Sequence, residues 1–290
     1  MTETLVASGG LVRGRVVRRL RPASPLVVGA FVVAAGILVM GVFGHLIAPQ
    51  DPNAQNLALP LSGPTSAHWF GTDALGRDVL SRVMYGARVS LIVGFAAVLT
   101  GGLVGATLGI LAGFRGGWLD SAIMTVADAQ LAFPFILLAI GIIAVLGPSF
   151  PTLIVVIGLS GWVAYARILR AQVLVLRSRE FVEAIQGLGG SVARVVLRHI
   201  LPNVLSSIVV VATLELARAI VLEATLGFLG LGIQPPTPSW GGMIHEGREY
   251  LDSAWWISTA PGLVLMLTSL VVSRTGDYLR DFLDPTLRGE

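Results

Sequence analysis

Long apolar runs alternate with polar segments along this chain, and their lengths predict helices that cross a membrane. The first run, residues 26–47, would be about 33 Å long as a helix, which is enough for the roughly 30 Å hydrocarbon core of a bilayer. It is too long for the apolar region of a cleaved signal peptide, so we expect an uncleaved span. Five further spans are predicted, at residues 89–112, 121–146, 151–169, 203–231 and 255–272.

The polar segments between these runs give the expected organisation of the chain. A five-helix core, residues 89–275, follows the first span and a polar loop. The expected polar parts are an N-terminal segment 1–25, a loop 48–88, a short loop 114–120, a loop 175–203, a loop 233–254 and a tail 276–290.

Composition supports the membrane assignment. The chain has 290 residues, of which 54% are hydrophobic and 13% charged, whereas soluble domains carry about 25% charged residues. We therefore expect an all-α integral membrane protein. Cysteine is absent, which excludes disulfides and thiolate chemistry. All twenty basic residues are arginine, and without a lysine the chain cannot form a complete phosphate-binding P-loop. If ATP drives this protein, another chain binds it.

The distribution of arginine predicts the topology. Fifteen arginines fall in segments on the side of the N-terminus, and only four (Arg77, Arg82, Arg88 and Arg248) fall in the loops on the opposite side. Because basic residues accumulate in cytoplasmic loops, we expect both termini and the loop 175–203 to be cytoplasmic. The loops 48–88 and 233–254 are then extracytoplasmic.

Two features inside the spans predict how the helices are shaped and packed. Gly101, Gly105, Gly109 and Gly113 recur every four residues and therefore share one helix face. Small residues at this spacing let helix backbones approach closely, although a glycine hinge is an alternative. Pro134, inside the third predicted span, should kink that span because proline removes a helical hydrogen bond.

Four charged residues fall inside predicted spans, namely Asp128, Glu215, Arg218 and Glu223. A charge near the bilayer centre costs about 2.5–3.5 kcal/mol, so Glu215, Arg218 and Glu223 of the fifth span should be paired or face water. Asp128, near the start of the third span, is expected to lie at the interface or to accept a hydrogen bond within the bundle. Glu215 and Arg218 are three residues apart and share a helix face, which favours an ion pair. A polar lining of a translocation path remains open, and so does an ion-coupled transporter that uses Asp128, Glu215 and Glu223 as carriers.

The loop 48–88 contains alternating charges in the stretch HWFGTDALGRDVLSRVMYGARVS, which begins at His68. Asp73 and Asp78 alternate with Arg77 and Arg82 near a glycine-rich turn. We expect a folded surface loop held by exposed ion pairs, each worth about 0–1 kcal/mol. A metal site formed by His68 and the aspartates is the less favoured interpretation.

The loop 175–203 contains EAIQGLGGSVARVVLRHILP, from Glu183 to Pro202, which predicts two short helices with a bend between them. One glycine of the pair Gly189-Gly190 can take the left-handed conformation that closes a helix. Ser191 is placed to cap the second helix, which should stop before Pro202. An ordinary amphipathic connector between two spans is the alternative.

This loop resembles the "EAA" loop of ABC-importer permease subunits, in which Glu-Ala-Ala is followed by a Gly six residues after the Glu and by Leu-Pro. Glu183, Ala184, Gly189, Leu201 and Pro202 match this pattern, while Ile185 replaces the second Ala. In that family the short helix is a coupling helix that sits in a groove of a cytoplasmic ATPase. The resemblance implies ATPase coupling by Glu183, Ala184, Ile185, Gly187, Leu188 and Gly189.

Two further stretches make the resemblance more specific. Gly-Thr-Asp from Gly71, Gly-Arg-Asp from Gly76 and Tyr-Gly-Ala-Arg from Tyr85 resemble the C-type permeases of dipeptide, oligopeptide and nickel importers, as do PPTPSWG and LRDFLDPTLR. The resemblance covers roughly residues 26–288. It implies a type I ABC-importer permease bundle of six transmembrane helices that forms half of a translocation pathway in a prokaryotic cell membrane.

The resemblance also implies the partners. They are a second homologous permease subunit, two cytoplasmic ATPase subunits or domains that bind ATP and Mg²⁺, and an extracytoplasmic solute-binding protein that delivers peptide. No catalytic residue, cofactor, metal or nucleic acid is expected for this chain. A membrane enzyme would need a convergent catalytic set, and the four histidines are scattered over separate segments.

Overall fold

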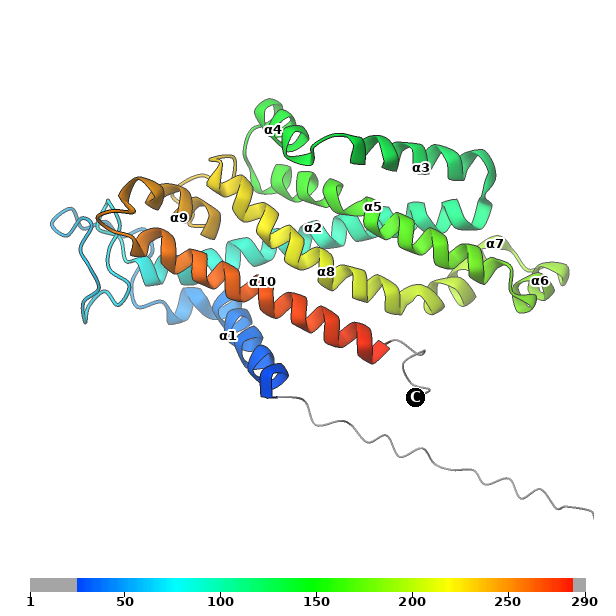
Figure 1. Ribbon diagram of the computed structural model, residues 1–290, viewed down its shortest axis with the longest axis horizontal. Helices are drawn as coiled ribbons and strands as arrows, with labels where there is room; N and C mark the ends of the chain where they lie inside the picture. Colours follow the sequence, from blue (N-terminus) through cyan, green and yellow to red (C-terminus); the bar gives the residue numbers. More distant parts are fainter. Residues whose placement is uncertain (1–24, 284–290) are drawn as a thin grey trace, which may run out of the picture.

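The computed structural model describes residues 25–283, which fold into helices joined by loops. In chain order these are α1 (Pro25–Ile47), α2 (Val79–Arg115), α3 (Gly117–Ala132), α4 (Phe135–Leu146), α5 (Phe150–Arg177), α6 (Glu180–Gly187), α7 (Val192–Val195), α8 (Leu201–Phe228), α9 (Trp240–Gly247) and α10 (Trp256–Leu283). The predicted N-terminal segment and the end of the predicted tail lie outside the described residues. Figure 1 shows a long, flat bundle with α6 at one end and α9 at the other.

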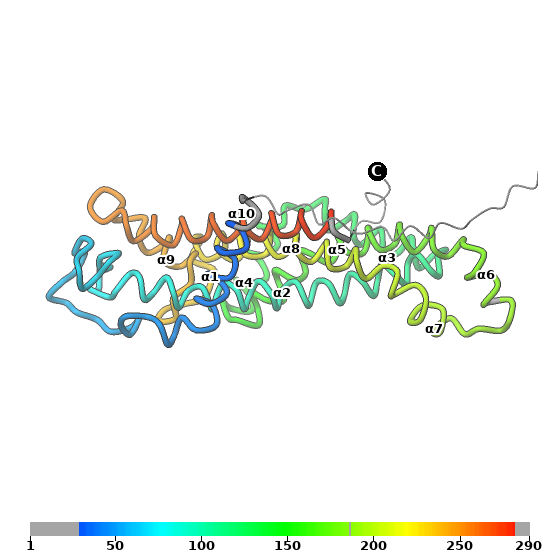
Figure 2. Tube along the Cα trace, turned by 90° about the horizontal axis from the view of Figure 1, so that it is seen from below, coloured from blue at the N-terminus to red at the C-terminus, as the bar shows by residue number. Residues whose placement is uncertain are grey.

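The all-α membrane class is confirmed. Five helices of the described part are long and apolar enough to cross a membrane, and α3 with α4 makes a sixth if this bent pair is one span. The long helices follow the long axis of the molecule (Figure 2). The loop that precedes α2 lies beside α9, and α7 lies beside α6 at the opposite end. The loop before α2 and the α9 region therefore lie at one end of the bundle, and the α6–α7 segment lies at the other end.

Helix α2 is the backbone of the fold, and it starts earlier than the sequence predicts. The predicted loop 48–88 ends at residue 88, but the helix begins at Val79, where Asp78 accepts a 2.8 Å hydrogen bond from the Ser81 amide and caps it. Its 37 residues span about 55 Å, so its ends extend beyond a bilayer core. The predicted loop 114–120 is also wrong, because only Gly116 separates α2 from α3.

The glycine row of α2 packs against α5, as predicted. A Cβ on Gly101 would lie 2.6 Å from the Gly158 carbonyl oxygen, and one on Gly109 would lie 2.5 Å from that of Ala166. The partner positions on α5 also recur every four residues, being Gly158, Trp162, Ala166 and Arg170. Two rows that advance together show that α2 and α5 run parallel in close backbone contact.

The third predicted span is broken rather than kinked. Helix α3 ends at Ala132, α4 begins at Phe135, and their axes differ by 91°. Phe133 is extended, with φ −97° and ψ 139°, because the ring of Pro134 disfavours the helical conformation in the residue before it. The predicted continuous helix 121–146 is therefore wrong.

The helix expected to stop before Pro202 instead continues through it. Residues Val196–Ile200 form a π-helical turn that joins α7 to α8, and the two helices with this turn make one apolar helix, Val192–Phe228. Pro202 lies in the first turn of α8, where the missing amide costs little. The Asn203 side chain donates a 2.6 Å hydrogen bond to the His199 carbonyl across this turn.

The other long helices also extend beyond the predicted ends of their spans, α5 to Arg177 and α10 to Leu283.

Candidate functional site

The first candidate site is α6, which connects α5 to α7 at one end of the bundle (Figure 1). The helix begins at Glu180, three residues before the predicted start. Val182 is fully buried in a cluster with Val195 and Ile200, and Ile185 packs against this cluster. These two apolar side chains fix the helix to the bundle.

The opposite face of α6 is open. Glu183 and Ala184 are exposed, and so are Phe181, at 43%, and Leu188, which directly follows the helix, at 90%. A large aliphatic side chain that is 90% exposed contributes almost nothing to the fold of this chain, and exposed apolar groups on a polar surface are typical of contact sites. The exposed side of this segment therefore offers apolar side chains, next to the Glu183 carboxylate, for contact with another protein.

The glycine pair after α6 has the predicted geometry. Gly189 has a φ of +80°, and the Gly190 amide donates a 2.9 Å hydrogen bond to the Ile185 carbonyl, which closes the helix. The Ser191 hydroxyl accepts from the Arg194 amide at 3.4 Å and caps α7. The predicted break and the predicted cap are both confirmed.

The second candidate site is an ion-pair cluster at the other end, where the sequence predicts exposed pairs. The Arg77 Nε atom donates to Asp73 at 2.6 Å, and both Arg77 and Arg82 contact the Glu246 carboxylate, at 3.0 and 2.8 Å. The arginines and Asp73 are buried, with side chains at most 9% exposed. The expectation of exposed pairs is wrong because Glu246, contributed by α9, covers the arginines.

The neighbouring His68 lies at the same end and pairs with Asp78. Its Nδ1 atom lies 3.0 Å from the Asp78 carboxylate, which also accepts from the Ser81 amide and hydroxyl. Among residues 25–283 no group of three histidine, cysteine or acidic side chains is arranged to hold a metal. The role of His68 and Asp78 is to fix the start of α2.

Two of the intramembrane acids have arginine partners. Glu215 accepts from Arg218 Nε at 2.9 Å, as predicted, and Arg218 also donates to the Ser160 hydroxyl at 2.8 Å. Asp128 pairs with Arg167 of α5 at 2.5 Å. Each acid has a separate partner, so the described structure does not gather them into one cation site.

Glu223 contradicts the expectation that every such charge is paired or water-facing. Its side chain is fully buried, and neither carboxyl oxygen has a hydrogen-bond partner with good geometry in the described part of the chain. The hydroxyls of Ser90 and Ser239 lie beside it, from α2 and the loop before α9. The prediction fails because α8 packs against α2 and α9 around Glu223. This packing removes the carboxyl group from solvent and places no basic side chain of the described chain beside it.

Several functional contacts were missed because their partners are distant in sequence. Asp120 at the start of α3 makes two hydrogen bonds, at 2.5 and 2.6 Å, with Arg170 of α5. Glu246 lies 169 positions from Arg77, and Ser160 lies 58 from Arg218. No local spacing rule relates such positions. For the two ion pairs, the only available signal is an acid and a base in separate polar segments of the chain.

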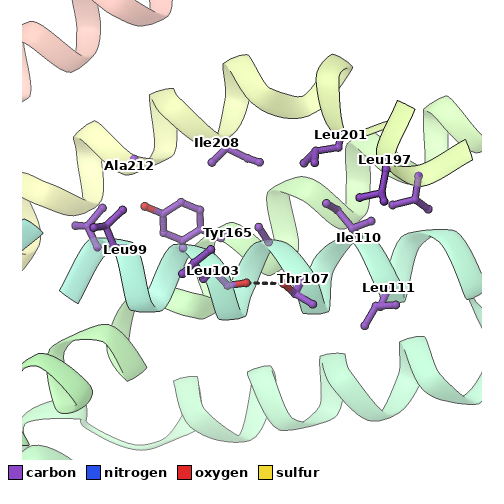
Figure 3. Close-up of a pocket in the computed structure, with 14 residues that line it drawn as sticks. Leu99, Leu103, Thr107, Ile110, Leu111, Tyr165, Leu197, Leu201, Ile208 and Ala212 are labelled. Carbon is purple, nitrogen blue, oxygen red and sulfur yellow. Dashed lines mark hydrogen bonds between the residues drawn. The ribbon is translucent and has the colours of Figure 1, made fainter. Parts of the chain in front are cut away.

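A cavity of about 440 Å³ lies between α2 and α8 near the α6 end. Figure 3 shows its wall of aliphatic side chains, including Leu103, Ile110 and Ile208, with Tyr165 at its base. The Tyr165 hydroxyl has no partner in the described chain, and the Thr107 hydroxyl donates to the Leu103 carbonyl within its own helix. Because this surface is so apolar, it is suited to contact with another apolar helix or with lipid, and it is unsuited to binding a polar solute.

Comparison with known proteins defines the class of this chain. Residues 105–289 match the family described as binding-protein-dependent transport system inner membrane component, and the chain belongs to this family. It is a multi-pass, non-catalytic permease subunit of an ATP-driven importer.

Among similar proteins is the dipeptide transport system permease protein DppC of Alkalihalophilus pseudofirmus, which is 43% identical over 272 residues, covering 93% of this chain and 89% of that protein. The glutathione transport system permease protein GsiD of Escherichia coli is 42% identical over 257 residues, covering 87% and 84%. The inward-facing MetNI methionine ABC transporter has a TM-score of 0.55 at 18% identity, covering 70% of this chain and 96% of that chain, and it supports the fold alone.

Proposed function

We propose that this chain is the membrane subunit of an importer for short peptides and that α6 couples it to cytoplasmic ATPases. The observation that carries the coupling role is the two-sided character of α6. Val182 and Ile185 hold the helix in the bundle, while Glu183, Ala184 and Leu188 face outward. The relatives named for dipeptide and glutathione transport support peptides as the substrate class.

The coupling step follows from how α6 is connected. It joins the end of α5 to the continuous helix Val192–Phe228, so a displacement of α6 pulls on two spans at once. A partner that binds α6 more tightly in one arrangement of the bundle shifts the population toward that arrangement. ATP and Mg²⁺ would be bound by that partner. This mechanism requires Gly187, Leu188 and Gly189 to keep α6 at a fixed angle.

The proposed orientation places both termini and α6 in the cytoplasm. The arginine distribution supports it, because Arg177, Arg179, Arg194 and Arg198 all flank α6. The ion-pair cluster of Asp73, Arg77, Arg82 and Glu246 then faces outward, where a solute-binding protein would dock. The lipid bilayer surrounds the helices between these two ends.

A second, homologous permease subunit would complete the pathway, with two ATPase subunits or domains below. The exposed apolar face of α3 and α4 supports such a partner, because Val126, Leu131, Leu137 and Val145 are all more than half exposed. The cavity beside Tyr165 adds a further apolar surface. An ion-coupled transporter finds no support, because Asp128 and Glu215 are neutralised by separate arginines.

The coupling role is tested at Leu188. Leu188→Glu places a charge on a side chain that is 90% exposed, so the fold should be unaffected, and Leu188→Met is the matched control. In liposomes with the partner subunits, the Glu variant should lose stimulated ATP hydrolysis and peptide uptake, while the Met variant retains both. Normal uptake by the Glu variant would refute the coupling role of this surface.

A further inference from the structure

Two half-exposed arginines lie on helices that are long and apolar enough to cross a membrane. Arg167 of α5 is 47% exposed, and Arg218 of α8 is 46% exposed. Asp128, which pairs with Arg167 from α3, is 66% exposed. An arginine within a span is unfavourable in lipid, so these side chains must meet water or polar groups of another chain.

The two arginines border one open face of α5. Figure 1 shows α5 between α3 and α8. Ser160, Ala164 and Arg167 are spaced by four and three residues, so they share one side of α5. Arg218 reaches this side from α8 by donating to the Ser160 hydroxyl, and Glu215 accompanies it as its ion-pair partner. We call these five residues the α5–α8 face.

The contacts of Arg218 place it near the middle of the bundle. Its partner Ser160 lies two residues after Gly158, whose carbonyl oxygen packs on Gly101. Gly101 is at the centre of the apolar run 89–112 of α2. Arg218 is therefore far from both polar ends of the molecule, where an exposed arginine would need no explanation.

Arg218 has an unused hydrogen-bond donor on the open side. Its Nε atom donates to Glu215 at 2.9 Å, and its Nη2 atom donates to Ser160 at 2.8 Å. Its Nη1 atom makes no hydrogen bond to any residue of the range 25–283. Since Nε and Nη2 are turned toward Glu215 and Ser160, Nη1 is the part of the guanidinium group that remains for the exposed side.

The open face of α1 shows a different character. Between residues 31 and 43 every exposed residue of α1 is apolar, including Leu38 and Val39, at 48% and 47%. Such a face is suited to lipid. The α5–α8 face is exposed to a similar degree at Arg218 but carries charged and hydroxyl groups, which are suited to water.

The charge balance at Arg218 favours a neutral ligand. Glu215, at 2.9 Å, already compensates the guanidinium charge. A second carboxylate at Nη1 would also meet the negative charge of Glu215, whereas a carbonyl oxygen would gain a charge-assisted hydrogen bond without this repulsion. The carbonyl groups of a peptide backbone are acceptors of this kind.

We propose that the α5–α8 face lines a water-filled path through the membrane and that Arg218 Nη1 donates a hydrogen bond to carbonyl groups of the passing solute. The choice of a short peptide as the source of these carbonyls rests on the proposed function. Because every peptide bond carries a carbonyl group, this contact would serve peptides with different side chains equally well.

The path is tested with single cysteines, because the chain contains none of its own. Ala164→Cys places a thiol on the α5–α8 face, and Val39→Cys is the control on the apolar face of α1. Each variant is assembled with its partner subunits in lipid nanodiscs, where both sides of the membrane are open to a charged, water-soluble thiol reagent. We expect Ala164→Cys to react at least tenfold faster than Val39→Cys. Equal rates would refute the proposal, because lipid or a partner helix would then cover this face.

The donor is tested by protection of the Ala164→Cys thiol. Ala-Ala and its C-terminal amide both carry carbonyl groups, but only Ala-Ala carries a carboxylate. We expect each to slow labelling at least threefold, and we expect this protection to disappear in the background Glu215→Gln with Arg218→Gln, which keeps the net charge but removes the guanidinium group. Protection by Ala-Ala alone, by neither solute, or equally in the double variant would refute the donor role.

A second variant covers the case in which the double variant unfolds, which its melting curve reveals. Arg218→Lys keeps the positive charge beside Glu215 but has a single nitrogen for all contacts, so it should show the same loss of protection. Full protection in this variant would also refute the donor role.

The outcomes distinguish this path from the proposed function. Fast labelling and protection by both solutes, with no ATP-driven peptide uptake in liposomes, would support the path and refute peptide transport. Normal uptake with slow labelling of Ala164→Cys would support transport and refute the path.

Discussion

Arg82 Nη2 donates a 2.8 Å hydrogen bond to Glu246 Oε2, which joins the first turn of α2 to α9 across 164 positions of sequence. Arg77 reaches the same carboxylate oxygen at 3.0 Å. Glu246 therefore shares with Asp73 the neutralisation of two buried arginines, and it links α9 to the segment around the start of α2. Because Glu246 contacts both buried arginines, removing its charge should affect both of them.

Removing the charge of Glu246 should destabilise the outer end. Glu246→Gln leaves Arg77 and Arg82 to share Asp73, and we expect a loss of about 1–3 kcal/mol, since Glu246 is 29% exposed and its pairs are only partly screened. The melting temperature in detergent reports this loss. Glu249→Gln, an exposed acid three residues further on, is the matched control and should leave the melting temperature unchanged. Equal effects of the two variants would contradict the role of Glu246.

The glycine row should tolerate no larger side chain. Gly105→Leu would force a Cβ against the Trp162 carbonyl oxygen and the Tyr165 side chain, so we expect a loss of at least about 1–3 kcal/mol. Gly36→Leu is the control, because a Cβ there meets no atom within 4 Å. Thermal unfolding in detergent compares them. An unchanged Gly105→Leu protein would show that the close approach of α2 and α5 is not required.

The pair of Glu215 and Arg218 should behave as a unit. Among residues 25–283, Glu215→Gln leaves Arg218 with only the Ser160 hydroxyl as a side-chain partner, and an unpaired arginine within a span is costly. We expect a lower melting temperature that the double variant Glu215→Gln with Arg218→Gln largely restores. This double-mutant cycle isolates the pairwise free energy. Additive effects would indicate that the two residues act independently.

Glu223 should be replaceable by its amide. The side chain is fully buried and has no charged partner in the part of the chain that the structure describes, and burying a carboxyl group in this way is unfavourable. Glu223→Gln keeps the shape and removes the ionisable group, so the melting temperature at neutral pH should rise. Glu223→Leu removes the polar group altogether and provides a comparison. A marked loss of stability in the Gln variant would reveal a partner for the carboxylate and contradict this interpretation.

The bend at Gly189 should matter for coupling more than for folding. Gly189 has a φ of +80°, but a Cβ added there would meet no atom within 4 Å, so Gly189→Val costs about 1–2 kcal/mol through the backbone alone. Gly189→Asn tolerates this conformation and serves as the control. We expect the Val variant to insert normally but to lose ATP hydrolysis stimulated by the loaded binding protein. Normal stimulation and uptake in reconstituted liposomes would make this loop a simple connector.

The sequence by itself determined the features that depend on neighbouring positions. Apolar run lengths predicted the membrane class, and the four-residue spacing of Gly101, Gly105 and Gly109 predicted a packing face. The three-residue spacing of Glu215 and Arg218 predicted their pair, and the pair Gly189-Gly190 predicted the end of a helix. These predictions succeeded because helix geometry relates residues within a few positions by fixed angles and distances.

The tertiary structure decided the contacts between segments that are far apart along the chain. It placed Glu246 on Arg77 and Arg82, set Arg167 against Asp128, and enclosed Glu223 without a charged partner. It also separated α3 from α4 by 91° and left Leu188 almost fully exposed. Local spacing carries no information about these choices, because each depends on which helix faces come together and on which side chains that packing removes from solvent.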